Sequence, residues 1–163
     1  RAKPIGLNTT AFTVDLNGAN LKTCFPYGWG GSHFDWLNDK ELMVSAKYNK
    51  KMYSHILFDV DKKNYKRLGK GLLDYDGHGT FSPDEKWLVT DTYPKNEMKE
   101  QKIYLMDMKT EAVISLGRFK NDEAYKKDWR CDIHCRWSPS GKIIGFNSTH
   151  NGTRQVYILK LNQ

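Results

Sequence analysis

The sequence predicts an all-β protein made of β-propeller blades, which are four-stranded antiparallel sheets arranged around a central channel. Short apolar runs alternate with clusters of Gly, Pro, Asn and Asp, and no segment places apolar residues at helical spacing. Three stretches that begin with a histidine align without a gap, at 33–46, 78–91 and 134–147. Four predicted strands recur about every 45 residues, which is the spacing typical of propeller blades.

Each repeat unit starts with its histidine and a short first strand that ends in a turn. Two of these turns are Ser82-Pro83-Asp84-Glu85 and Ser138-Pro139-Ser140-Gly141. The predicted second strands are 42–44, 87–89 and 143–145. The predicted third strands are 56–60, 104–108 and 157–161. A fourth strand is predicted in two units only, at 65–69 and 112–117. We expect the aromatic residues that share one position of the first strand to pack between blades: Trp36, Phe81 and Trp137.

The N-terminal region fits the same scheme out of phase. Residues 12–16 match a third strand and residues 21–25 a fourth, with Asn17-Gly18 as the tight turn between them. We therefore treat 1–163 as a single propeller portion with four parts. These are the outer strands of one blade at 1–27, complete blades at 28–70 and 71–119, and three strands of a last blade at 120–163.

This division gives a partial ring of about three to four blades, whereas ordinary propellers have about four to eight. The chain alone is therefore not expected to close a ring. We expect the remaining blades, and the missing last strand, to come from an upstream segment or a second chain. An uncovered strand edge would otherwise be a site of aggregation.

Composition narrows the possible partners. A chain of 163 residues with 13% aromatic residues suits one domain with a substantial core. The net charge of +7 indicates either a solvated surface or attraction for a polyanion. We expect no nucleic acid partner, because no basic helix or nucleic-acid-binding module is recognisable, and an anionic oligosaccharide is the better candidate. No run approaches the roughly 20 apolar residues of a membrane span.

The cysteines and the start of the chain say less about function. Three cysteines, Cys24, Cys131 and Cys135, are too few for a disulfide framework. The chain opens on Arg1 without a visible signal peptide, so it is either a mature protein or a fragment. Both the bacterial periplasm and the cytoplasm are compatible with this sequence.

Three histidines, His33, His78 and His134, occupy one position of the repeat. The first strand of each blade lines the channel of a propeller, so we expect the three side chains to converge near its axis. Neutral imidazoles are common metal ligands and good proton acceptors near neutral pH. The structural alternative is that these histidines form hydrogen bonds between blades.

The residues around His134 extend this candidate site. Cys131 lies three residues before His134, and Cys-x-x-His can bind zinc, although a buried thiol is an equally good interpretation. Strand alternation directs Cys135 away from His134 and into the core. Arg136 shares the face of His134 and could hold a carboxylate in a fork, or form an ion pair between blades.

Four further residues are candidates for contact with a sugar: Trp29, Tyr93, Arg130 and Arg154. Trp29 lies in a glycine-rich entry to the first histidine, and Tyr93 follows a second strand together with Asp91 and Thr92. Arg130 opens the His134 motif, and Arg154 opens the last strand. A structural role is the alternative for each.

Several of these motifs resemble known propellers. The Ser-Pro-Asp turn is similar to those of TolB and WD-type repeats. A sharper resemblance is to the oligogalacturonate lyase family, and it covers most of residues 28–161. The segments that carry it are Gly31-Ser32-His33-Phe34-Asp35-Trp36, Gly77-His78-Gly79-Thr80-Phe81-Ser82-Pro83-Asp84, Thr90-Asp91-Thr92-Tyr93-Pro94, Arg130-Cys131-Asp132-Ile133-His134-Cys135-Arg136-Trp137 and Ser148-Thr149-His150-Asn151-Gly152-Thr153-Arg154-Gln155-Val156-Tyr157.

The resemblance implies a seven-bladed propeller that binds manganese near its channel and cleaves uronate-containing chains by β-elimination. By position, His33 would be the base that removes the C5 proton, and His78 and His134 would be metal ligands. A bound cation would neutralise the uronate carboxylate and so acidify the adjacent C–H bond.

Two positions depart from the family pattern. Cys131 stands where the family has a glutamine, and Arg136 stands where it has a second histidine. In one interpretation a divalent metal is held by a different set of ligands, and zinc is favoured if Cys131 is one of them. In a second interpretation Arg136 neutralises the uronate carboxylate and no metal binds. In a third interpretation, catalysis has been lost.

The leading hypothesis is therefore a polysaccharide-lyase-like propeller that acts on uronate-containing oligosaccharides. The alternative is a non-catalytic propeller that binds a glycan or protein partner. A TolB-like domain fused to a hydrolase is a weaker third option, because nothing in the sequence resembles a nucleophile elbow.

Overall fold

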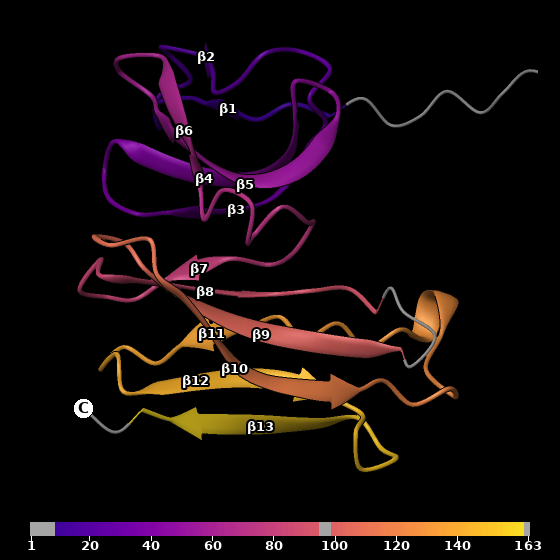
Figure 1. Ribbon diagram of the computed structural model, residues 1–163. Helices are drawn as coiled ribbons and strands as arrows, with labels where there is room; N and C mark the ends of the chain where they lie inside the picture. The colour runs from indigo at the N-terminus through magenta and orange to yellow at the C-terminus, as the bar shows by residue number, and fades with distance from the viewer. Residues whose placement is uncertain (1–8, 95–98, 162–163) are drawn as a thin grey trace, which may run out of the picture.

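The computed structural model describes residues 9–94 and 99–161. It confirms the predicted fold class, because these residues form β-strands and one short 3-10 helix, η1 (Lys127–Trp129), and no α-helix. No helix within the described ranges is long and apolar enough to cross a membrane. Figure 1 shows the main sheets stacked one after another in chain order.

All strand pairs in these sheets are antiparallel, and each sheet is built from consecutive strands. The first sheet has the order β3 (Gly31–Trp36), β4 (Glu41–Tyr48), β5 (Met52–Asp59) and β6 (Asn64–Leu68). The second sheet has the order β7 (Thr80–Phe81), β8 (Trp87–Asp91), β9 (Glu100–Asp107) and β10 (Val113–Lys120). The third sheet has three strands, β11 (Arg136–Trp137), β12 (Ile143–Ser148) and β13 (Gln155–Lys160). A two-stranded ribbon, β1 (Phe12–Thr13) and β2 (Lys22–Thr23), precedes them.

Apolar clusters between the sheets form the core. One cluster joins the first sheet to the second and includes Met43, Leu57 and Met106. Another joins the second sheet to the third through Leu105 and Ile144. A middle strand that is covered on both faces loses the alternation of apolar and polar residues, and β4 accordingly has five consecutive buried residues.

The first strands of the sheets lie at their common inner side, where β7 contacts both β3 and β11. The carboxylate of Asp35 in β3 accepts hydrogen bonds from the hydroxyl of Thr80 and the backbone N–H of Phe81 in β7. The indole of Trp137 in β11 donates to the carbonyl of Thr80. Phe81 and Trp137 pack between sheets as expected, whereas Trp36 is 45% exposed.

One detail of the predicted repeat is wrong. The strand register pairs Trp36 with Leu42, Phe81 with Leu88 and Trp137 with Ile144. The gapless alignment makes Leu42 equivalent to Trp87, whereas the strand pairing makes Leu42 equivalent to Leu88. The turn between the first two strands is one residue shorter in the first sheet, so the second strands are shifted by one position while the histidines stay aligned.

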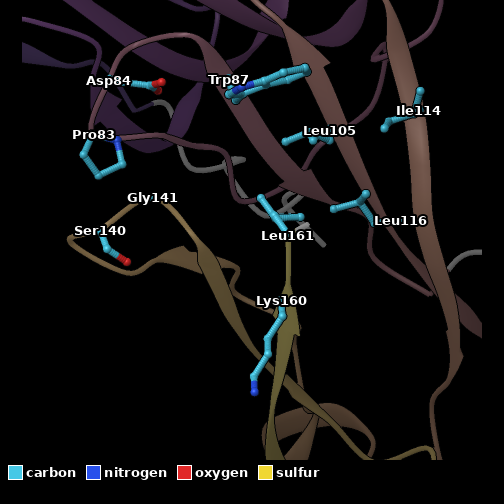
Figure 2. A pocket seen from close by; sticks show the side chains of 10 residues that line it. All are labelled: Pro83, Asp84, Trp87, Leu105, Ile114, Leu116, Ser140, Gly141, Lys160 and Leu161. Atoms are coloured by element: carbon cyan, nitrogen blue, oxygen red, sulfur yellow. The ribbon is translucent and has the colours of Figure 1, made fainter. Parts of the chain in front are cut away.

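The third sheet is left open at β13. Val156 and Ile158 of β13 are 76% and 57% exposed. The residues at the same repeat positions are His55 and Leu57 in β5, and these side chains are 0% and 3% exposed. Beside this open strand, Leu105, Ile114, Leu116 and Leu161 line an apolar groove between β10 and the end of β13, which Figure 2 shows.

Candidate functional site

The three repeat histidines meet at the start of the innermost strands. His33 lies in β3, and His78 and His134 each lie two residues before the start of a first strand, β7 and β11. The ring centroids of His33 and His78 are 4.1 Å apart, and those of His78 and His134 are 3.6 Å apart and stacked. The ring of His78 therefore contacts both other imidazoles, edge-on with His33 and stacked with His134.

The backbone at two of these histidines has an unusual conformation. His33 and His134 adopt positive φ values of 49° and 50°. In the first sheet, the strand register shifts between Ser32 and Phe34, which marks His33 as the extra residue of a bulge. A bulge of this kind changes the direction of a side chain. His33 therefore does not follow the alternation of side chains between the two faces of the sheet.

Asp91, at the end of β8, forms hydrogen bonds with two of the three histidines, His78 and His134. This carboxylate is 1% exposed and accepts hydrogen bonds from the backbone N–H of His78 at 2.9 Å and of His134 at 2.7 Å. It also accepts one from Nδ1 of His78, at 2.9 and 3.1 Å from its two oxygens. A carboxylate beside Nδ1 keeps a proton on that nitrogen, so Nε2 is the nitrogen of His78 that remains for another partner.

Tyr93 reaches the same cluster from the loop after β8. Its phenol oxygen is 3.0 Å from Nε2 of His33 and 3.2 Å from Nε2 of His78. Burial, followed by the nearby Asp132 carboxylate, raises the pKa of Tyr93 above its usual value, so the phenol keeps its proton. A protonated phenol has a single hydrogen to donate, so it donates to Nε2 of only one of the two histidines at a time.

Burial is also the main reason that the pKa values of His33 and His134 lie below the ordinary value, with the neighbouring His78 as the second cause. Both imidazoles are therefore neutral at neutral pH. A neutral imidazole can accept a proton or bind a metal ion, whereas an imidazolium can do neither.

Asp132 and Arg130 form the outer wall of the site. Nε of Arg130 is 2.5 Å from one carboxylate oxygen of Asp132, and a terminal nitrogen is 2.8 Å from the other. The guanidinium of Arg130 also lies over the ring of Tyr93, at 4.8 Å from its centroid. Arg130 thus links the Asp132 carboxylate to the phenol that contacts two histidines.

Three of these side chains could hold a metal ion. One ligand atom from each of His78, Asp132 and His134 lies within 4.8 Å of the other two. Two imidazoles and a carboxylate suit manganese, iron or zinc. The Asp91 carboxylate behind His78 is the outer partner that metal-binding histidines usually have. The residues present therefore fit a divalent metal.

Cys131 is not in this group of possible ligands. Its side chain is buried, and burial raises the pKa of its thiol. The structure groups Asp132 with the two histidines where the sequence had suggested Cys131. Cys135 lies in the core between the second and third sheets, as strand alternation had indicated.

The other predicted contact residues have different positions. Arg136 is exposed, and its guanidinium donates to the backbone carbonyl of Cys135 rather than entering the histidine cluster. Arg154 donates to the carbonyls of Trp129 and Arg130, so it supports the loop that carries Arg130. Trp29 is 4% exposed and packs edge-on against Tyr48 and Tyr65, so its ring lies in the core and offers no surface to a sugar.

Two acidic residues of the site were not among the residues predicted from the sequence. Asp76 and Asp132 each lie two residues before a repeat histidine, so the pattern Asp-x-His occurs twice. Asp76 accepts a hydrogen bond from Ser45 at 2.7 Å, and its negative charge favours the protonated form of His33. The repeated spacing was the available signal for both residues.

Fold and site together define a β-propeller portion with a histidine, tyrosine and carboxylate cluster at its inner side. No family model matches the chain, and no curated protein sequence is similar to it. Solved propeller structures do match. TolB from Acinetobacter baumannii is 19% identical with a TM-score of 0.73, over 94% of this chain and 35% of that one.

The predicted resemblance to TolB-like and oligogalacturonate-lyase-like propellers is confirmed at the level of the fold. An oligogalacturonate lyase from Vibrio parahaemolyticus is 15% identical with a TM-score of 0.71, over 93% of this chain and 42% of that one. An oligogalacturonate lyase in complex with manganese is 16% identical with a TM-score of 0.50, over 92% and 53% of the two chains. The chain thus spans between about a third and a half of these proteins.

Proposed function

We propose that this chain carries the active site of a lyase that cleaves uronate-containing oligosaccharides by β-elimination. The observation that carries the proposal is the contact of Tyr93 with both His33 and His78, beside a group of possible metal ligands. The likeness to two solved oligogalacturonate lyases gives it further support. The net charge of +7 favours an anionic substrate.

His33 is the proposed base. In β-elimination the C5–H bond breaks, the C4=C5 double bond forms, and the C4–O bond breaks with its electron pair on the departing oxygen. With the proton of neutral His33 on Nδ1, the C5 proton passes to Nε2 of His33, which lies 3.0 Å from the Tyr93 hydroxyl. The Tyr93 phenol returns a proton to the departing oxygen and recovers it from His33, so the pair ends unchanged.

His78, His134 and Asp132 are the residues that would hold a divalent metal. A bound cation would neutralise the uronate carboxylate and make the C5 proton more acidic. Manganese is the preferred candidate, because a carboxylate and two imidazoles suit it and no thiolate is among these ligands. Zinc through Cys131 is less favoured, since burial raises the pKa of its thiol and so disfavours the thiolate that binds a metal.

The remaining blades are part of the same proposal. The exposed Val156 and Ile158, whose counterparts in the first sheet are buried, indicate a face built to receive another blade. A fourth strand paired with β13 would also lie across the apolar groove of Figure 2. We propose that these elements come from an upstream segment of the same protein or from a second chain.

A direct test uses the complete protein that contains this chain, incubated with oligogalacturonate, ulvan or glycosaminoglycan fragments. Cleavage by elimination creates an unsaturated uronate that absorbs ultraviolet light. His33→Ala should abolish this absorbance, whereas His150→Ala, in a loop outside the cluster, should not. Failure of the complete protein to act on every uronate polymer would refute the lyase assignment.

A second candidate is a metal-free propeller that binds an anionic glycan without cleaving it. The observation that favours it is the Arg130 fork on Asp132, which occupies both oxygens of one possible metal ligand. Elemental analysis distinguishes the two. Stoichiometric manganese or zinc that is lost in a His78→Ala/His134→Ala double variant supports the lyase, and a metal-free protein that retains glycan binding supports the scaffold.

A further inference from the structure

Asp132 belongs to two groups at once. One of its carboxylate oxygens is within 4.8 Å of ligand atoms of His78 and His134. At the same time both oxygens accept hydrogen bonds from the guanidinium of Arg130. A carboxylate in such a fork has its best lone pairs occupied, and a cation beside it also meets the positive charge of Arg130. The fork and a metal ion therefore compete for Asp132.

The two partners differ in their access to solvent. The side chain of Asp132 is 15% exposed, whereas that of Arg130 is 45% exposed. Arg130 is also held in place independently of Asp132, because its guanidinium lies over Tyr93 and its backbone carbonyl accepts from Arg154 at 3.1 Å. When Asp132 turns to a metal, Arg130 stays at the mouth of the site with an unpaired fork that a dissolved ligand can reach.

We propose that Arg130 exchanges carboxylates: it holds Asp132 when the site is empty, and it holds the carboxylate of an anionic sugar when a metal ion has taken Asp132. This inference rests on the metal site of the proposed function. The planar guanidinium matches any carboxylate in two parallel hydrogen bonds, so one anion replaces the other without a change of geometry.

A coupling between two ligands follows from this exchange. A uronate that occupies Arg130 releases Asp132 for the metal, and a metal that occupies Asp132 releases Arg130 for the uronate. Each ligand must then raise the affinity for the other by the same factor. For a partly exposed charge pair we expect a factor of about three to ten.

The experiment measures binding of Mn²⁺ by calorimetry to the complete protein, with and without saturating galacturonate. In the wild type, galacturonate should tighten Mn²⁺ binding about three- to ten-fold. Arg130→Gln should bind Mn²⁺ more tightly than the wild type by a similar factor and should not respond to galacturonate. Arg136→Gln is the matched control, because Arg136 is exposed nearby and its guanidinium donates to the carbonyl of Cys135 rather than to Asp132; it should behave as the wild type does.

A second experiment measures galacturonate binding in the absence of any metal. In the presence of a chelator, Asp132→Asn should bind galacturonate more tightly than the wild type does, because Arg130 has lost its internal partner. Equal galacturonate affinity in the two proteins, or a full galacturonate response in Arg130→Gln, would overturn the exchange. A wild type that binds no Mn²⁺ would overturn the exchange with a metal, and tighter galacturonate binding by Asp132→Asn would then leave Arg130 only as a uronate-binding group.

Discussion

Tyr93 and His33 are 60 positions apart in the sequence, and the phenol oxygen of Tyr93 lies 3.0 Å from Nε2 of His33. The contact crosses from the second sheet to the first, on the inner side where the first strands meet. It places a phenol, whose raised pKa keeps it protonated, against an imidazole whose lowered pKa keeps it neutral.

The first prediction concerns this pair. Tyr93→Phe removes only the hydroxyl and should lower the elimination rate about 10²- to 10⁴-fold, the usual contribution of a positioned acid–base group. Its unfolding midpoint should change little, because the ring is retained. Tyr27→Phe is the matched control, since Tyr27 is 71% exposed. An unchanged rate in Tyr93→Phe would exclude the phenol from the reaction.

The second prediction concerns Asp91. Its carboxylate accepts two backbone N–H groups and one imidazole N–H. An amide at this buried position would turn an NH₂ group toward one of those donors. Asp91→Asn should therefore lower the free energy of unfolding by about 2–4 kcal/mol, measured by urea denaturation. Asp39→Asn, on an exposed turn, should change it by less than about 0.5 kcal/mol.

The third prediction concerns pH and a histidine outside the site. His55 is fully buried, with Nε2 at 2.7 Å from the hydroxyl of Thr90 and Nδ1 at 3.3 Å from the carbonyl of Leu73. Burial lowers the pKa of His55. The unfolded chain, with a histidine pKa of about 6.5, therefore binds a proton that the folded state does not, and stability falls as the pH drops below about 6.5.

His55→Gln removes this titration. The slope of the unfolding free energy between about pH 6.5 and 5 should then decrease by up to about 1.4 kcal/mol per pH unit. The slope is the quantity to compare, since the substitution also changes stability at every pH. A His55→Gln profile parallel to that of the wild type would contradict a neutral buried imidazole.

The fourth prediction concerns the open strand β13. Ile158→Lys should lower the unfolding free energy of the complete protein by about 2–4 kcal/mol, because the side chain would be buried under the next blade. In residues 1–163 alone the same change should be nearly neutral, since Ile158 is 57% exposed. Amide hydrogen exchange in β13 should likewise be slow only in the complete protein. Equal effects in the two proteins would mean that no blade covers this face.

The sequence predicted the sheets because propeller blades are local structures. Turn signals and apolar runs of neighbouring strands fix each sheet, and the repeat then places one histidine at each first strand. The shift of Leu42 could not be predicted, because a turn shortened by one residue leaves no trace in composition. It became visible only in the pairing of Trp36 with Leu42.

The site was less predictable because its decisive contacts lie between sheets. Asp91 is a routine strand-end carboxylate in the sequence, and only the packing of the third sheet on the second brings it to His134. Trp29 lies in a glycine-rich loop, and this position in the sequence predicts an exposed ring that could contact a sugar. Its burial depends on Tyr48 and Tyr65, which come from later strands.

The left-handed backbone at His33 and His134 has a consequence for how such a protein can change during evolution. Among residues other than glycine, asparagine and aspartate adopt this conformation most readily, and β-branched residues the least. A replacement of His33 by asparagine removes the imidazole while retaining the backbone geometry on which the bulge depends. A single substitution of this kind would remove the proposed base with little loss of folding stability, so the backbone of this site does not depend on the imidazole.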